Sequence, residues 1–238
     1  MESGLTVTGL RKSFGERTVL NGVDFSVGAG ELVALLGANG SGKSTALRCV
    51  VGLVEADAGV VRVAGRAAAM VFQQIHLVRR RNVVDNVCAG GLAGLPLSRS
   101  LTPALFPKDL RDRAMACLDR VGLADRAKDR AGSLSGGQQQ RVAIARALCQ
   151  GAKVLLADEP VSALDPAAAT QVMELLQKLA HNDGLAVAAV LHQPDLARRY
   201  ADRVLGLLNG EIRLSTKGSE LSDMDIDALY APDRAAAA

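Results

Sequence analysis

The most constraining stretch of the sequence is Gly37–Ser44, which reads GANGSGKS and fits the pattern G-x-x-x-x-G-K-[ST]. The preceding run ELVALLG is typical of a short buried strand, and a helix is predicted from about Ser44 to Val51. Glycines let the backbone curl with its N–H groups pointing inward, which is a geometry that holds phosphate. A Gly-rich turn with an exposed lysine is the alternative, but the strand before it and the helix after it favour a phosphate loop. On this interpretation Lys43 reaches the β- and γ-phosphates of a nucleotide, and Ser44 binds Mg²⁺.

A second apolar run, KVLLADEP, ends in the two acidic residues Asp158 and Glu159. Because parallel strands place their C-terminal ends at one edge of a sheet, these carboxylates are predicted to lie beside the phosphate loop. Asp158 can then hold Mg²⁺, in part through water, and Glu159 can polarise an attacking water molecule. The structural alternative for Glu159 is an acidic residue at the start of a helix, before Pro160.

Apolar strands and helices alternate along much of the chain. Strands are predicted at GVVRVAG, AAAMVFQQ, KVLLAD, LAVAAVLH, RVLGLL and EIRL, and a helix at about 136–149. Such alternation predicts a parallel sheet that is covered on both faces. Residues 79–130 have a helical pattern instead, with Leu110, Ala114 and Leu118 on one face together with Val121.

Composition and charge exclude several classes of protein. The 238 residues are 49% hydrophobic, which suits one large domain spanning 1–238. Aromatic residues make up only 3%, without Trp, so stacking platforms for nucleic acid are disfavoured. The net charge is +3 and does not imply a nucleic-acid partner. The short basic run Arg79–Arg81 is expected to be a solvated loop. No nucleic-acid partner is predicted.

The remaining local patterns predict an ordinary cytoplasmic chain. The four cysteines match no metal-binding spacing and lie in apolar sequence, so they are expected to be reduced core thiols. The N-terminus lacks the features of a signal peptide, and no apolar run approaches the ~18 residues of a membrane helix. Asn21-Gly22 is prone to form a turn. The final APDRAAAA is expected to be a frayed tail.

The sequence LSGGQ, residues 134–138, stands at the start of the helical pattern QQRVAIARALCQ. Ser135 can serve simply as the N-cap that satisfies a backbone N–H group. Alternatively, the unpaired N–H groups and the dipole of a helix start can hold an anion. These five residues alone leave both interpretations open.

Taken together, GANGSGKS, LSGGQQQRVAIARAL, VLLADEP, SALD and a His after the next strand resemble the ATP-binding cassette (ABC) ATPases over about residues 4–215. The resemblance implies a P-loop NTPase (RecA-like) α/β core with an N-terminal antiparallel β-lobe. It also implies an inserted helical subdomain at about 75–134 and a C-terminal helix and tail at about 216–238. Only thirty residues separate Lys43 from Gln73, so the β-lobe is expected to be shortened at AGRAAAMV.

The family also implies roles for individual residues. The nucleotide-binding set is Phe14, whose ring would stack on adenine, with Gly37, Ala38, Asn39, Gly40, Ser41, Gly42, Lys43, Ser44 and Thr45. The catalytic set is Glu159, His192, Gln73 and Lys43, and the metal set is Ser44, Gln73 and Asp158. The signature residues Ser135, Gly136, Gly137 and Gln138 would hold the nucleotide of a partner chain, and Asp165 would link the two sites of a head-to-tail dimer. Gln74 is a rival for the role of Gln73, an exposed strand-end Phe is the alternative for Phe14, and LHQ replaces the commoner TH around His192.

These roles predict hydrolysis of Mg-ATP to ADP and phosphate, with water as the acceptor. The expected partners are a second copy of the chain, membrane permease subunits that dock at the helical insertion and, indirectly, a periplasmic or extracellular solute-binding protein. The chain would then act at the cytoplasmic face of the inner membrane. The stretches LFPKDL and LHQPDLARRYADR are similar to ATPase subunits of phosphonate importers. Import of phosphite or another small solute, a soluble non-transport ABC ATPase and a P-loop phosphotransferase are the alternatives, of which LSGGQ disfavours the last.

Overall fold

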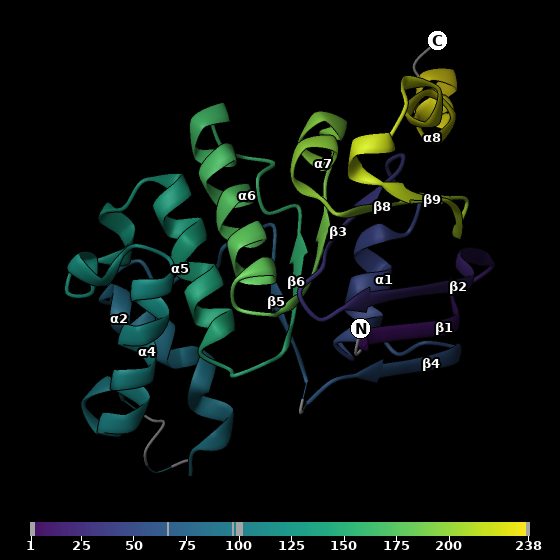
Figure 1. Ribbon diagram of the computed structural model, residues 1–238. Coiled ribbons are helices and arrows are strands. Elements are labelled where there is room, and N and C mark those ends of the chain that lie inside the picture. The colour runs from purple at the N-terminus through teal and green to yellow at the C-terminus, as the bar shows by residue number, and fades with distance from the viewer. Residues whose placement is uncertain (1–2, 66, 97, 99–101, 237–238) are drawn as a thin grey trace.

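The apolar runs of the sequence form a six-stranded sheet with the strand order β5-β6-β7-β3-β8-β9. The computed structural model describes residues 3–65, 67–96, 98 and 102–236 (Figure 1). The strands of this sheet are β3 (Leu32–Leu36), β5 (Ala68–Val71), β6 (Val154–Asp158), β7 (Ala186–Val190), β8 (Arg203–Leu208) and β9 (Glu211–Lys217). Neighbouring strands run parallel except for β9, which pairs antiparallel with β8.

The three central strands are buried along their whole length, because helices and the second sheet cover both faces. Their register pairs Leu35 with Val190 and Asp158 with the same Val190. The carboxyl ends of β3, β6 and β7 therefore meet at one edge, where the chain continues into the phosphate loop, Glu159 and, two residues beyond β7, His192. The predicted convergence of these motifs follows directly from the sheet topology.

A second sheet of three antiparallel strands, in the order β2-β1-β4, packs at one end of the molecule. Its strands are β1 (Ser3–Phe14), β2 (Arg17–Gly28) and β4 (Ala58–Val63). The turn predicted at Asn21-Gly22 is wrong, because both residues lie inside β2. The register passes from Val23 to Asn21 opposite consecutive residues of β1, and Gly22 has φ of 78°, so the pair forms a bulge.

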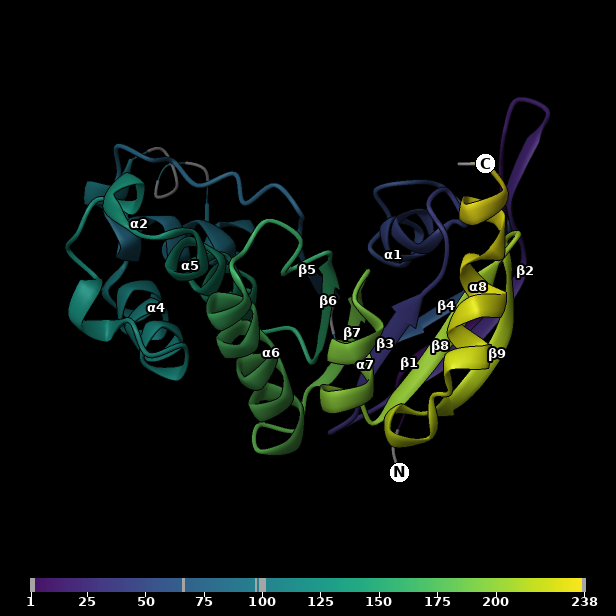
Figure 2. The same cartoon turned by 90° about the horizontal axis from the view of Figure 1, so that it is seen from above.

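Helices cover the two faces of the large sheet unequally (Figure 2). Helix α1 (Lys43–Val50) lies on the side of the small sheet, and α6 (Pro166–His181) and α7 (Pro194–Tyr200) lie on the opposite side. Two apolar clusters result, one between the large sheet and its helices and the other between the large sheet, α1 and the small sheet.

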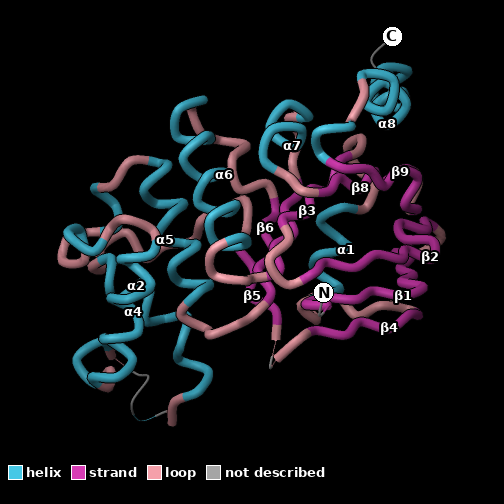
Figure 3. Tube along the Cα trace, viewed as in Figure 1, coloured by secondary structure: helices cyan, strands magenta, loops and turns pink. Residues whose placement is uncertain are grey.

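The segment 75–134 is built from helices without any strand among its described residues (Figure 3). It contains α2 (Val83–Cys88) and α4 (Lys108–Arg120), with short 3₁₀ turns at Ala89–Gly94, Pro103–Leu105, Ala124–Arg126 and Ala131–Ser133. The next helix, α5 (Gly136–Leu148), packs against both α2 and α4. As predicted from the helical pattern, Leu110, Ala114, Leu118 and Val121 are buried.

Helix α8 (Asp223–Ala236) follows a 3₁₀ turn at Gly218–Glu220 and packs beside β8. It extends through residues 231–236, where a frayed tail is predicted from the sequence. The last two alanines of that stretch lie outside the described residues. Among the described residues, no helix is both long and apolar enough to cross a membrane. All four cysteines are buried free thiols, as predicted.

Candidate functional site

The phosphate loop connects β3 to α1, the position that its motif requires. Gly42 forms the N-cap of α1 with φ of 106°, a conformation that L side chains rarely adopt. A Cβ atom at this position would lie 2.8 Å from the carbonyl oxygen of Val19 and 2.8 Å from Leu20 Cδ2. Glycine is therefore required here by the packing of the loop against β2, in addition to any requirement of a ligand.

Lys43, the first residue of α1, is only 5% exposed. Its Nζ atom donates hydrogen bonds to the carbonyl oxygens of Gly37 at 2.8 Å and Ala38 at 2.9 Å. The loop thus holds the ammonium group of Lys43 against its own curled backbone. This ammonium group supplies the positive charge that a bound phosphate group would contact.

Ser44 and Asp158 face one another across the edge of the sheet. The Ser44 hydroxyl donates to Asp158 Oδ1 at 2.6 Å, and Arg48 Nη2 lies 3.7 Å from Asp158 Oδ2. Asp158 is only 3% exposed. A hydroxyl and a carboxylate are the hard oxygen donors that suit Mg²⁺, so the chemistry of this pair fits the predicted metal set.

Glu159 is held between two polar side chains. Gln73 Nε2 donates to Glu159 Oε2 at 2.7 Å, and His192 Nε2 lies 2.7 Å from Glu159 Oε1. The backbone of Glu159 has φ of 52°, which is uncommon for a residue with a side chain and typical of functional sites. The structure therefore brings together three residues that are 33 or more positions apart in the chain. Gln74, the rival of Gln73, instead contacts His76 Nδ1 through its carbonyl oxygen at 2.5 Å.

A cavity of about 270 Å³ lies between Lys43, Ser44, Glu159 and His192. Its walls come from the phosphate loop, from Glu159 and His192, and from two residues of β2, Arg17 and Val19. Neither residue was predicted from the sequence. The signal that would have found them is their position in the hairpin that follows Phe14, which the family pattern had already placed beside the nucleotide.

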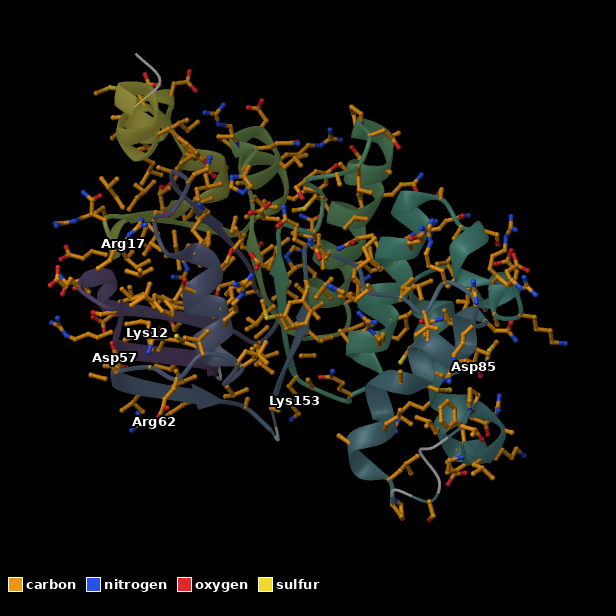
Figure 4. The ribbon with its side chains drawn as sticks, turned by 180° about the vertical axis from the view of Figure 1, so that it is seen from behind. Lys12, Arg17, Asp57, Arg62, Asp85 and Lys153 are labelled. Carbon is orange, nitrogen blue, oxygen red and sulfur yellow. The ribbon has the colours of Figure 1, made fainter. Side chains whose placement is uncertain are left out.

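Phe14 itself does not line this cavity. It ends β1 with its side chain 53% exposed, and Lys12 Nζ lies 5.4 Å from the centroid of its ring. Lys12 is in turn paired with Asp57 at 2.8 Å, and Figure 4 shows the two side chains together on the small sheet with Arg17 nearby. The ring is thus an exposed apolar surface at the end of the hairpin that supplies Arg17.

The signature residues form the start of α5. Ser135 is its N-cap, and a capping box joins Ser135 Oγ to the N–H group of Gln138 at 3.3 Å and the Gln138 side chain to the N–H group of Ser135 at 3.0 Å. A Cβ atom on Gly137 would lie 2.8 Å from Ala168 Cβ, so this glycine permits close packing against α6. Ser135 therefore does act as an N-cap, which is one of the two roles that the sequence allows for it.

Asp165 is likewise an N-cap, and it accepts a hydrogen bond from the N–H group of Ala168 at 2.9 Å. In the part of the chain that the structure describes, neither Asp165 nor any residue of 135–138 lines the cavity at the phosphate loop. Within one chain, the two predicted anion-binding elements consequently do not share that cavity.

Comparisons with known proteins identify the family of this chain. The ABC transporter family matches residues 20–162. The chain is 45% identical to the phosphonates import ATP-binding protein PhnC 2 of Pseudomonas savastanoi pv. phaseolicola, over 98% of this chain and 91% of that protein. It is 41% identical to the hypophosphite import ATP-binding protein HtxD of Stutzerimonas stutzeri, over 95% of this chain and 70% of that protein.

Solved structures that resemble this chain are also ATP-binding cassettes. The ADP conformation of MJ1267, an ATP-binding cassette of an ABC transporter, has a TM-score of 0.82 at 25% identity and covers 98% of this chain and 97% of its own. The dimeric post-hydrolysis state of the cassette MJ0796, bound to ADP and Pi, has a TM-score of 0.71 at 32% identity and covers 90% of this chain and 98% of its own. The predicted α/β fold is thereby confirmed, and the chain belongs to the ABC transporter family as an ATP-binding cassette.

Proposed function

We propose that this chain hydrolyses Mg-ATP in a head-to-tail dimer and thereby drives uptake of phosphonate through a separate permease. The observation that carries the catalytic part is the cluster at the mouth of the phosphate-loop cavity. There Ser44, Glu159 and His192 line a single space of about 270 Å³. Hydrogen bonds join Asp158 to Ser44 and Gln73 to Glu159.

In this proposal each side chain has a separate task. The loop N–H groups and Lys43 bind the β- and γ-phosphates, and transfer of the γ-phosphoryl group then depends mainly on positioning and charge stabilisation. Glu159 accepts a proton from the attacking water, which Gln73 helps to orient. His192 lies on the other carboxylate oxygen of Glu159, where it can donate to the γ-phosphate as charge develops.

Ser44, Asp158 and Gln73 would hold Mg²⁺. The hydroxyl of Ser44 and the carboxylate of Asp158 already lie within 2.6 Å of one another, so the two ligands need little rearrangement to face one ion. When bound, Mg²⁺ neutralises charge on the β- and γ-phosphate oxygens. Arg48, at 3.7 Å from Asp158, supplies part of the positive charge around this carboxylate.

The separation of the two anion-binding elements supports the proposed dimer. Because Ser135 and Gly137 do not line the cavity of their own chain, they can meet a nucleotide only if a second chain presents it or if α5 moves. The cassette MJ0796, which is 32% identical to this chain, is dimeric in its state with ADP and Pi. We propose that Ser135 and the following N–H groups hold the γ-phosphate of the partner's ATP, and that Asp165 links the two sites.

Support for the transported solute comes from the names of similar proteins. PhnC 2, at 45% identity over nearly the whole chain, is a phosphonates import protein, whereas HtxD, at 41% identity, imports hypophosphite. Phosphonate is therefore the first choice, and phosphite, hypophosphite or another small oxyanion is the alternative. The helical segment 75–134 is the proposed docking surface for the permease at the cytoplasmic face of the membrane, and a solute-binding protein would select the cargo.

Two experiments test this function at separate levels. Purified protein should release ADP and phosphate in equal amounts, whereas transfer to a metabolite would yield ADP with a phosphorylated product. A deletion strain should fail to grow on a phosphonate as its sole phosphorus source and should grow normally on phosphate. Growth equal to the parent on phosphonate, with no second cassette to substitute, would remove the cargo assignment and leave the ATPase assignment intact.

A further inference from the structure

The segment that joins β5 to α2 carries Gln73 and is held by side chains of two helices. Arg146, on α5, donates from Nη2 to the carbonyl oxygen of Ile75 and from Nη1 to the carbonyl oxygen of His76, each at 2.9 Å. Farther along, Asn86 of α2 accepts from the N–H group of Val78 at 2.8 Å and donates to its carbonyl oxygen at 3.2 Å. At the end of the segment beside β5, the side chain of Gln73 donates a hydrogen bond to Glu159.

The contact of Arg146 is specific in its geometry. A guanidinium group is a rigid planar fork, so it can hold two successive carbonyl groups at once, which a lysine ammonium cannot do in the same way. His76, at the second carbonyl, has φ of 45°, an uncommon conformation for a residue with a side chain. Burial lowers the pKa of Arg146, so the two hydrogen bonds replace water around a partly desolvated cation.

Arg146 also lies on the same helix as the signature. It follows Ser135 by eleven residues, which places it about 16 Å along the axis of α5 from the N-cap. Helix α5 packs against β5, α2 and α6, and Figure 2 shows it between the helical end of the molecule and the large sheet. A rigid helix with Ser135 at one end and the Arg146 fork near the other connects the signature to the segment that orients Gln73.

We propose that Arg146 is a positioning residue that couples α5 to Gln73, so that a shift of the signature helix changes the hydrogen bond between Gln73 and Glu159. This inference rests on the proposed ATPase function. Arg146 acts through the backbone at Ile75 and His76 and has no contact with the reacting atoms. In the dimer it makes the geometry of a chain's own catalytic group depend on whether its signature holds the partner's nucleotide.

The test compares Arg146→Lys with Arg141→Lys. Arg141 is on the same helix and also donates to a backbone carbonyl, that of Val121 at 3.1 Å, but far along the chain from Gln73. Arg146→Lys is expected to lower kcat about tenfold with the KM for ATP unchanged, because it removes an interaction that matters in the transition state only. Rates are normalised to the fraction of protein that binds a fluorescent ATP analogue, so partial unfolding cannot imitate the effect.

A double-mutant cycle with Gln73→Ala then separates positioning from general damage. If Arg146 acts through Gln73, the variant with both Arg146→Lys and Gln73→Ala hydrolyses ATP no more slowly than Gln73→Ala alone. Arg141→Lys is expected to change activity by the same factor in either background. Arg146→Gln, which keeps one donor amide, repeats the cycle with a second side chain.

If the parent protein hydrolyses ATP and the double variant is slowed by the product of the factors for Arg146→Lys and Gln73→Ala alone, the coupling is wrong and the proposed function still holds. A fall in ATP affinity equal to the fall in kcat/KM would also overturn it, because the fork would then serve nucleotide binding. A parent protein that binds ATP without hydrolysing it would contradict the proposed function itself.

Discussion

Replacing Glu159 by Gln separates proton abstraction from phosphate binding, because the amide keeps the shape of the carboxylate and loses its basicity. The carboxylate contacts Gln73 Nε2 and His192 Nε2, each at 2.7 Å. An amide offers one acceptor oxygen and one NH₂ donor, so it can accept from Gln73 but keeps the contact with His192 only where the imidazole Nε2 is the acceptor. Loss of one hydrogen bond to a charged group costs about 1.5–3 kcal/mol of folding stability, and the 17% exposure of the side chain leaves water a limited role in replacing it.

The expected catalytic loss is larger and of a different kind. Removal of a general base lowers the rate by about 10²–10⁴-fold, which corresponds to roughly 3–5.5 kcal/mol in the barrier. ATP affinity should remain, because the phosphate loop and the Ser44–Asp158 pair are untouched, and an ATP-bound dimer should accumulate. Steady-state phosphate release, ATP titration and size-exclusion chromatography with Mg-ATP measure the three effects, with Glu174→Gln on the exposed face of α6 as the matched control.

Hydrolysis at the parent rate by Glu159→Gln would refute the role of Glu159 as base. So would a loss of hydrolysis matched by an equal loss of ATP affinity, because the side chain would then serve binding. A variant that is unfolded at the assay temperature and no longer binds ATP, while Glu174→Gln folds and binds ATP as the parent does, would assign the defect to folding.

Two further predictions concern Phe14, at the end of β1, and the buried thiol of Cys88. Phe14→Ala should weaken binding of ATP and GTP alike by roughly 0.5–1.5 kcal/mol, because stacking depends on the face of a base and not on its edge; equal affinities for parent and variant in a fluorescence titration would return the exposed ring to a structural role. Burial raises the pKa of the Cys88 thiol from its ordinary value of 9.0 to about 11. Above pH 9 the unfolded chain therefore loses a proton that the folded chain retains, so the stability that Cys88 contributes is present below pH 9.0 and lost by about pH 11. In urea unfolding, the difference in stability between the parent and Cys88→Ala should narrow from about pH 8 to about pH 10.5, and a constant difference would contradict the assigned cause.

The sequence predicted the elements with the strongest local signals. The phosphate loop and the buried strands were recognisable because glycine spacing and uninterrupted apolar runs have few alternative structures. The convergence of Ser44, Asp158, Glu159 and His192 followed from one topological rule, that parallel strands end at a common edge. Asn21-Gly22 misled the prediction because the same residue pair suits a turn and a bulge, and only the pairing with β1 decides between them.

Contacts made across the fold were beyond the reach of sequence patterns. Arg17 and Val19 enter the cavity because β2 passes beside the phosphate loop, and their place in the hairpin after Phe14 is the one local signal of this contact. Arg146 lies in an ordinary helical pattern, and its partners at Ile75 and His76 are 70 or more residues away. The roles proposed for Ser135 and Gly137 toward a partner's nucleotide leave no trace in one chain, because both residues already satisfy local requirements of α5.

The central claim, that the signature of one chain completes the nucleotide site of another, is tested most directly by mixing two inactive variants. Ser135→Arg blocks the signature and Lys43→Ala disables the phosphate loop, so each mixed dimer has one site with both defects and one with neither. Random pairing makes half of the dimers mixed, and about a quarter of the parental ATPase activity is then the most that can return. We predict that activity rises toward this level on mixing, while each variant alone stays inactive. No rise above the separate variants, in a sample where mixed dimers are shown to form, would contradict the claim and favour convergence of the two elements within one chain.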